Sequence, residues 1–226
     1  MSNATMGSFL DIFAAPNDVF NRIREKTLSA WLALIIVLLV STATMAWYFM
    51  TVDLYQFMET SMAISGQTAT SAELDTILQQ EGVIRIVSTV TTSVSSLVMF
   101  FILGLFFFLA ALVAAEEKIT YGQCLAVVAW GSVPGLISVF SMAISWFLAN
   151  DFVYLTALDQ TSLANLLGMT VNSPNFDVFS IFSVGTIWSY ALFGIGFAKI
   201  TRSSAVTATV VGIIPPTIHI GLTYLF

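Results

Sequence analysis

Residues 116–135 read EEKITYGQCLAVVAWGSVPG, in which three charged residues precede an apolar run that contains Gly131 and Pro134. Such an apolar run is typical of a helix that crosses a lipid bilayer, where every backbone N–H and C=O needs a partner inside the protein. Proline removes one backbone donor and clashes with the carbonyl group four residues earlier. The stretch therefore predicts a membrane-spanning helix with a bend in its interior.

Composition places the rest of the chain in the same class. Hydrophobic residues make up 58% of the sequence and charged residues 9%, and the mean hydropathy is +0.92. A membrane-spanning helix needs about 20 consecutive apolar residues, whereas a β-barrel shows short alternating segments. The sequence therefore predicts an all-α integral membrane protein with a single membrane domain over residues 1–226. Five transmembrane helices are expected, at residues 28–52, 86–115, 120–149, 177–198 and 203–226.

The basic residues predict the orientation of these spans, because lysine and arginine are enriched in loops on the cytoplasmic side. Six of the seven basic residues precede span one or lie between spans two and three or four and five: Arg22, Arg24, Lys26, Lys118, Lys199 and Arg202. Only Arg85 falls in the opposite set of loops. We therefore expect a cytoplasmic N-terminus and an external C-terminus.

Two segments, residues 53–85 and 150–176, are predicted to be external loops that cover the bundle, because they are longer than simple connections. A short helix capped by Ser71 and another that ends at Gly168 are expected within them. Most acidic residues gather on this side: Asp53, Glu59, Glu73, Asp75, Glu81, Asp151, Asp159 and Asp177. We interpret them as a solvated surface, and the alternative is a vestibule that attracts cations.

Residues 8–26 are predicted to form a cytoplasmic interfacial helix. Their apolar side chains make apolar faces on short helices that Pro16 interrupts. Arg22, Arg24 and Lys26 lie alongside, and basic residues favour the anionic cytoplasmic leaflet. Membrane lipids are therefore the expected partner of this segment. The alternative is a docking site for a soluble protein.

The opening stretch has a counterpart later in the chain. Shifted by 81 residues, KITYGQCLAVVAWGSVP (118–134) aligns with KITRSSAVTATVVGIIP (199–215), and the glycine and proline positions match. Gly104 and Gly185 fall in register as well. Spans two and three and spans four and five are therefore predicted to be two helical-hairpin repeats, related by an axis along the membrane normal, with span one as an extra helix.

The two aligned prolines define the candidate functional site. Pro134 and Pro215 are expected to leave the carbonyl groups of Trp130 and Val211 short of hydrogen-bond partners. Small residues near both prolines allow helices to approach closely, so we expect bent helices packed on each other. The alternative is a polar cavity between the repeats, lined by freed carbonyls and hydroxyls. The candidate residues are Trp130, Gly131, Ser132, Pro134, Gly135, Ser138, Val211, Gly212, Pro215, Thr217 and His219.

The remaining reactive side chains give little support to catalysis. His219 is the only histidine, and because a metal site needs several ligands, we expect a neutral histidine held by packing. Glu116 and Glu117 form a pair of acids, but their place beside Lys118 favours a solvated turn. Cys124 has no second cysteine with which to form an internal disulfide. No catalytic or nucleotide-binding motif appears, so we expect no enzyme activity, no metal and no cofactor.

Several segments of the chain form a recognisable combination: IFAAPNDVFNRI at residues 12–23, YGQCLAVVAWGSVPGLI at 121–137 and LFGIGFAKITRSSAVTATVVGIIPP at 192–216. With five spans and an inside N-terminus, this combination resembles bacterial members of the Yip1 domain family over nearly the whole chain. The best matching positions are Tyr121, Gly122, Gly131, Pro134 and Gly135. Eukaryotic relatives carry a DLYGP-type segment before the second span, and here only DLY at residues 53–55 is present, in a different place.

The resemblance implies an architecture more than an activity. It implies a multi-pass protein of the bacterial cytoplasmic (inner) membrane. Eukaryotic members associate with Rab-type small GTPases and with each other in vesicle traffic, a pathway that bacteria lack.

Two functions of different classes follow. The first is a non-catalytic scaffold or adaptor that works through helix–helix association, with self-association and with other membrane or cytoplasmic proteins as partners and without nucleic acid. The alternative is a transporter or channel for an ion or small solute, with a pathway between the two kinked hairpins. An enzyme that acts on lipid is a more distant third, for want of catalytic groups.

Overall fold

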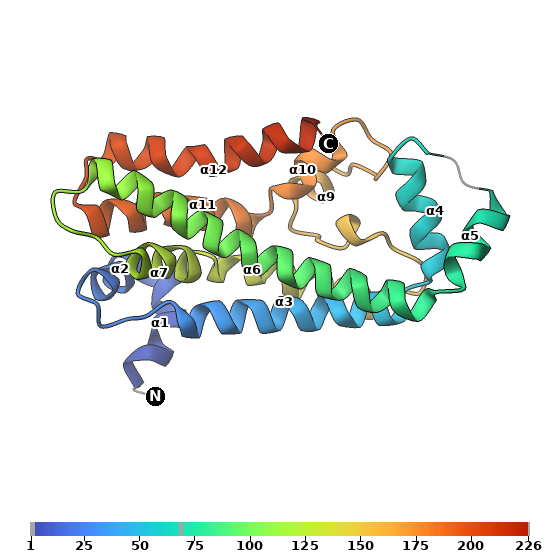
Figure 1. Ribbon diagram of the computed structural model, residues 1–226, viewed down its shortest axis with the longest axis horizontal. Coiled ribbons are helices and arrows are strands. Elements are labelled where there is room, and N and C mark those ends of the chain that lie inside the picture. The colour runs from blue at the N-terminus through green and yellow to red at the C-terminus, as the bar shows by residue number, and fades with distance from the viewer. Residues whose placement is uncertain (1–2, 68–69, 226) are drawn as a thin grey trace. The chain divides into compact units, whose positions relative to one another are not determined.

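The computed structural model describes residues 3–67 and 70–225, and within these ranges the chain is built from helices, with no strand (Figure 1). One isolated β-type backbone pairing, between Ser162 and Ser183, joins two loop segments. The prediction of an all-α protein is confirmed.

Four helical segments in the described ranges are long and apolar enough to cross a membrane. They are α3 (Trp31–Thr51), α6 (Glu81–Ala114), the α7–α8 segment (Tyr121–Leu148) and residues 205–223 of α12 (Ala205–Leu225). The predicted fourth span, residues 177–198, is divided between α10 (Phe176–Ile181) and α11 (Val184–Thr201). Because α11 has only 18 residues and carries Lys199 in its last turn, a fifth span stays a prediction.

The chain divides into two compact units. Unit 1 comprises residues 1–38, 96–136 and 184–226, and unit 2 comprises residues 39–95 and 137–183. The boundaries between them fall inside α3 and α6 and at the start of α8 (Leu136–Leu148), so single helices contribute to both units.

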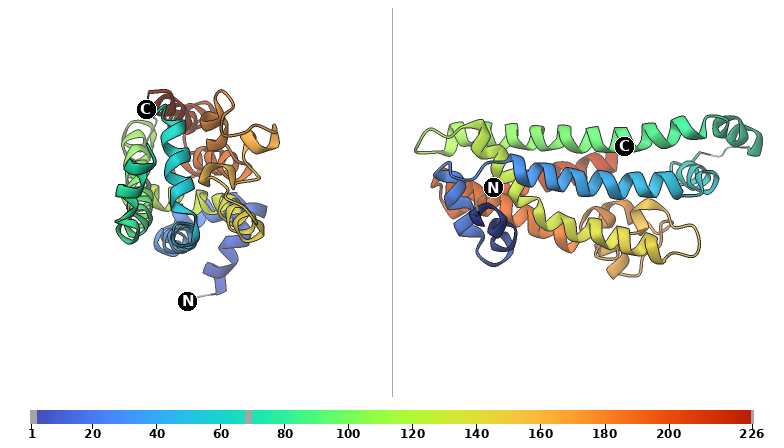
Figure 2. Two further views of the ribbon diagram at one scale, coloured as in Figure 1. Left: turned by 90° about the vertical axis from the view of Figure 1, so that its right-hand side faces the viewer. Right: turned by 90° about the horizontal axis from the view of Figure 1, so that it is seen from below.

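In unit 1 the N-terminal segment forms two helices, α1 (Asn3–Ala14) and α2 (Pro16–Arg24), which lie against each other (Figure 2). Pro16 begins α2 because its fixed φ suits the first helical position, where no backbone donor is needed. The apolar face of α2 consists of Val19, Phe20 and Ile23, which are fully buried against α7 and α11. This face, on which the prediction of an interfacial helix depended, is therefore covered by protein.

The centre of unit 1 is formed by α7 (Tyr121–Gly131) and α11. Every residue of α7 from Gln123 to Gly131 is buried, and a capping box of Thr120 and Gln123 begins the helix. Figure 1 shows α12 running alongside α11, and α11 also contacts α2, α7 and the short 3-10 helix η1 (Val133–Gly135). From α6, the ring of Phe107 packs at 5.8 Å from Phe193 and 5.9 Å from Phe197.

In unit 2 the two predicted loops are folded and contain short helices: α4 (Leu54–Ile64), α5 (Ser71–Leu78), the 3-10 helix η2 (Leu155–Ala157) and α9 (Leu163–Leu166). Asp53 caps α4, and Thr70 with Glu73 forms a capping box on α5. The prediction that Ser71 caps this helix is wrong by one residue, because the threonine before it supplies the hydroxyl. Gly168 follows α9 with a φ of +68°, so the expected stop there is confirmed.

Arg85 on α6 secures the end of α3 in unit 2. Its guanidinium donates to the carbonyl of Phe49 and, at 2.9 Å, to the carbonyl of Val52. It also forms an ion pair of 2.6 Å with Glu81, one helical turn away. The last carbonyls of a helix have no partner within the helix, and a guanidinium satisfies two of them at once. The one basic residue outside the predicted cytoplasmic loops therefore has a structural role.

Candidate functional site

The first proline lies where a helix ends. The helix α7 ends at Gly131, Ser132 caps it, and Pro134 lies in η1 before α8 begins. The prediction that the Trp130 carbonyl lacks a partner is wrong, because backbone N–H groups at the cap donate to the carbonyls of Trp130 and Val128. The Ser132 hydroxyl also donates to the Val128 carbonyl, at 2.8 Å.

Trp130 joins α7 to the N-terminal segment. Its side chain is fully buried, and its indole Nε1–H donates to the carbonyl of Ser29 at 2.9 Å. The ring centroid lies 4.9 Å from that of Phe9. The amide of Gln123 makes a similar link by donating to the carbonyl of Arg24 at 3.0 Å. Two buried polar side chains of α7 thus hold the chain on either side of the turn between α2 and α3.

The backbone around Pro134 is in close contact with α11. A Cβ atom added to Gly185 would collide with the carbonyl oxygen of Pro134 and would lie 3.2 Å from the Cα of Gly135. A Cβ atom on Gly131 would lie 2.7 Å from the ring of Phe193. These contacts leave no space for a side chain between η1 and α11. The first kink region is therefore closely packed.

The second proline lies within an uninterrupted helix, since α12 continues through both Pro215 and Pro216. A Cβ atom on Gly212 would lie 3.1 Å from the Cα of Gly194, so α12 and α11 also meet backbone to backbone. The hydroxyl of Thr217 donates to the carbonyl of Ile213 at 2.9 Å. The aligned prolines thus occupy different local structures, a 3-10 turn in one case and a helix interior in the other.

The eleven candidate residues do not converge on one site. The backbone of Pro134 meets α11 at Gly185, whereas Gly212 meets it at Gly194. Ser138 belongs to unit 2, where its hydroxyl lies 2.5 Å from that of Ser183. A groove of about 350 Å³ runs along α11 and α12, and most of its lining consists of alanine, glycine and isoleucine. This groove lies within the second predicted hairpin, and its lining is mainly apolar.

The imidazole Nδ1 of His219 lies 3.2 Å from the hydroxyl of Tyr190 on α11. Within the described ranges, no group of three or more histidine, cysteine, aspartate or glutamate side chains is placed to hold a metal ion.

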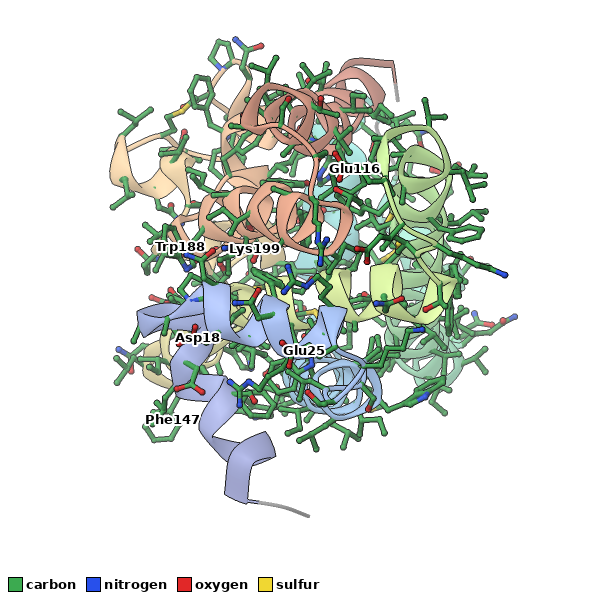
Figure 3. All side chains as sticks on the ribbon, turned by 90° about the vertical axis from the view of Figure 1, so that its left-hand side faces the viewer. Asp18, Glu25, Glu116, Phe147, Trp188 and Lys199 are labelled. Atoms are coloured by element: carbon green, nitrogen blue, oxygen red, sulfur yellow. The ribbon has the colours of Figure 1, made fainter. Side chains whose placement is uncertain are left out.

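The two hairpin turns of unit 1 are joined by an ion pair. Glu117, in the turn between α6 and α7, lies 2.7 Å from Arg202, in the turn between α11 and α12, and both side chains are about half exposed. Figure 3 is viewed from the side on which these two turns lie, with Glu116 and Lys199 labelled. Glu117 is therefore a surface ion-pair partner, in agreement with an exposed turn.

Sequence reasoning missed the importance of α11. Gly185 meets η1, Gly194 meets α12, and a Cβ atom on Gly196 would lie 2.7 Å from Val127 and 2.8 Å from Phe20. Each of the neighbours η1, α12, α7 and α2 therefore packs against one of these three glycines. The available signal was the presence of three glycines within 18 residues of an otherwise apolar segment, because glycine is unfavourable in a helix unless another backbone approaches it.

An all-helical chain with several helices long and apolar enough to cross a bilayer is a multi-pass membrane protein. The chain belongs to the Yip1 domain family, since the model of the Yip1 domain matches residues 10–226. The match begins in α1, so the N-terminal helices that pack on α7 and α11 are part of the family domain. The comparisons with curated proteins and with solved structures gave no match.

Proposed function

We propose that the chain is a non-catalytic scaffold or adaptor of the bacterial inner membrane, which works through helix–helix association. The observation that carries this proposal is the packing of α11. Its glycines contact backbone or large buried side chains of η1, α12, α2 and α7. A solute pathway between the two kinked hairpins needs polar, hydrated space at this place, and close backbone contact favours a packed structural centre.

The proposed topology has five spans, with α11 as the fourth, a cytoplasmic N-terminus and an external C-terminus. Its support is the division of charge. Six of the seven basic residues belong to unit 1, whereas unit 2 has one basic and eight acidic residues. Because basic residues are enriched in cytoplasmic loops, this division supports a cytoplasmic position for the loops of unit 1. Several external acids have structural partners, such as Asp53 at α4 and Glu81 with Arg85, which favours a folded surface over a cation vestibule.

Self-association is proposed to use α6. This helix has 34 residues, and only Gly104, Phe107 and Ala111 are buried. Many of its other large apolar side chains are exposed, including Leu105 and Leu109. Lipid satisfies an apolar surface as well as protein does, so association in the membrane depends on close packing of such faces. The membrane-surface contact predicted for residues 8–26 is proposed for α1, where Leu10 and Phe13 are exposed.

The test of a dry centre uses cysteine accessibility in the full chain with Cys124 replaced by alanine. Single cysteines replace Ser132 and Ser189, which flank the contact between η1 and α11, and Ser65, which is exposed. In sealed proteoliposomes, a water-soluble maleimide is expected to label the cysteine at 65 and to leave those at 132 and 189 unmodified. Labelling of both protected positions, together with flux of a cation or small anion above that of empty liposomes, supports transport and contradicts the scaffold.

The test of self-association uses Leu109→Cys in the same background. Oxidative cross-linking in membranes is expected to give a covalent dimer. Val128→Cys is the matched control, because Val128 is fully buried in α7 and its cysteine is expected to stay monomeric. Equal amounts of monomer for both variants contradict the use of α6 in association.

A further inference from the structure

A pocket of about 410 Å³ opens in unit 1 between the end of α2, the start of α3, the start of α7 and α6. Its lining includes the polar residues Lys26, Ser29 and Thr120. It also includes the apolar residues Trp31, Phe101 and Leu125. The pocket is thus amphipathic, with a cation among its lining residues.

The pocket lies where spans begin. Trp31 is the first residue of α3, and its side chain is 58% exposed. Tyr121 is the first residue of the α7–α8 segment and also lines the pocket. Tryptophan and tyrosine concentrate at the boundary between hydrocarbon and headgroups. An amphipathic pocket at the ends of two spans suits a ligand with a polar head and an apolar tail.

Lys26 is held in an unusual backbone conformation. Its φ is +59°, and the turn is closed by hydrogen bonds from Lys26 N to Ile23 O at 3.0 Å and from Thr27 N to Arg22 O at 2.9 Å. This position, just after a helix, favours glycine, because a side chain is strained there. The side chain is exposed, and no ion pair joins it to an acidic residue of the described ranges. Lysine thus occupies a position at which the left-handed backbone conformation favours glycine.

We propose that this pocket binds an anionic phospholipid, with Lys26 as the cation for the phosphate and the wall of Trp31, Phe101 and Leu125 against the hydrocarbon. The positive charge of Lys26 favours an anionic ligand, and the apolar lining favours a lipid over free phosphate. The site is separate from the α11 contacts that support the scaffold proposal. Its failure would therefore leave that proposal standing.

The first pair of variants tests the charge. Lys26→Gly removes the cation and relieves the left-handed strain, so it is expected to fold at least as stably as the wild type. Arg202→Gly is the matched control, because Arg202 also has a left-handed φ, of +56°, and lies outside the pocket. Native mass spectrometry of the full chain in detergent, titrated with phosphatidylglycerol, measures the bound fraction. Lys26→Gly is expected to weaken binding about fivefold, the contribution of one basic residue near an anionic lipid, and Arg202→Gly to leave it unchanged.

The second pair tests the cavity. A Cβ atom on Gly122, which lines the pocket at the second position of α7, meets nothing within 4 Å. Gly122→Phe is therefore expected to fill the pocket without a backbone clash and to abolish phosphatidylglycerol binding. Gly82→Phe is the control, because Gly82 is the second residue of α6 and is equally open.

The choice of lipid decides the ligand class. Phosphatidylglycerol is expected to bind at least fivefold more tightly than phosphatidylcholine, and glycerol 3-phosphate is expected not to displace it. The proposal would be overturned if the two lipids bound equally or if glycerol 3-phosphate displaced phosphatidylglycerol. It would also be overturned if Lys26→Gly and Arg202→Gly had equal effects on binding. Full binding by Gly122→Phe would overturn it as well.

Discussion

Unit 1 holds its helices together through glycines and fully buried apolar side chains, whereas unit 2 relies more on caps, hydroxyl contacts and aromatic pairs. In unit 1, Gly185 and Gly212 each bring two backbones into contact. In unit 2, the hydroxyl of Tyr48 donates to the carbonyl of Val153 at 3.1 Å, and the rings of Phe57 and Tyr154 stack at 5.5 Å. A change of one methyl group is therefore expected to damage unit 1, while unit 2 is expected to respond to the loss of single polar groups.

The largest expected effect is that of Gly185→Leu. The new side chain would collide with the Pro134 carbonyl, and overpacking of a backbone contact costs about 3 kcal/mol or more. Thermal unfolding in detergent, followed by size-exclusion chromatography, is expected to show little folded monomer. Gly82→Leu is the control, since its Cβ atom meets nothing within 4 Å. Equal melting temperatures for the two variants would mean that α11 and η1 do not pack as described.

The next effect is expected in unit 2, from Arg85→Met. The change leaves the carbonyls of Phe49 and Val52 without their donor and costs about 2 kcal/mol, because hydrogen bonds from charged groups are the stronger ones. Chemical denaturation in mixed micelles measures it. The comparison variant is Arg202→Met, whose ion pair with Glu117 is about half exposed and is worth less than about 1 kcal/mol. A larger loss from the exposed residue would contradict the capping role.

A smaller effect is expected from Trp130→Phe in unit 1. The phenyl ring keeps most of the buried apolar area but cannot donate to the Ser29 carbonyl, so about 1 kcal/mol is lost. Trp188→Phe makes the same chemical change at a side chain that is 39% exposed and is expected to be nearly neutral. Proteolysis of the N-terminal segment measures the difference, since a weaker link to α7 exposes residues near 29. Identical cleavage rates for the two variants would show that the Trp130 hydrogen bond does not hold the N-terminal segment against α7.

The smallest effect concerns the cap of α5 in unit 2. Hydrogen bonds from the backbone and side chain of Thr70 lower the pKa of the Glu73 carboxyl group. A lowered folded-state pKa means that the cap stabilises the helix at neutral pH and loses this contribution as pH falls through that lowered pKa. Hydrogen exchange protection of α5, corrected for intrinsic rates, is expected to decrease in this acidic range. Glu73→Gln keeps a capping side chain and is expected to show no such pH dependence.

The sequence predicted the helical class, the family and the close packing near Pro134 because these depend on composition and on small residues at recognisable spacings. It did not predict that Pro134 lies in a 3-10 turn while Pro215 lies inside α12. Aligned residues suggested equal structures, yet the neighbours differ: η1 meets Gly185 of α11, and α12 meets Gly194. Tertiary contacts decide how a helix accommodates proline, and they are not visible in a local pattern.

The N-terminal segment shows the same limit. The apolar spacing of Val19, Phe20 and Ile23 correctly predicted an amphipathic helix, but amphipathicity does not say what covers the apolar face. The covering surface comes from Val127 and Gly196, more than a hundred residues away. Gln123 and Trp130 were predictable as polar groups that need partners when buried. Their acceptors, near residues 24 and 29, were not predictable.

The place of α11 also bears on how the protein is made. This helix carries Ser189, Tyr190 and Lys199, and it is synthesised after α7 but before α12. Until the ribosome has made α12, Gly194 lacks the backbone of Gly212, which it contacts in the folded protein. The contact between α11 and α12 is therefore expected to form late in synthesis, after the helices that pack on the other glycines of α11 have been made.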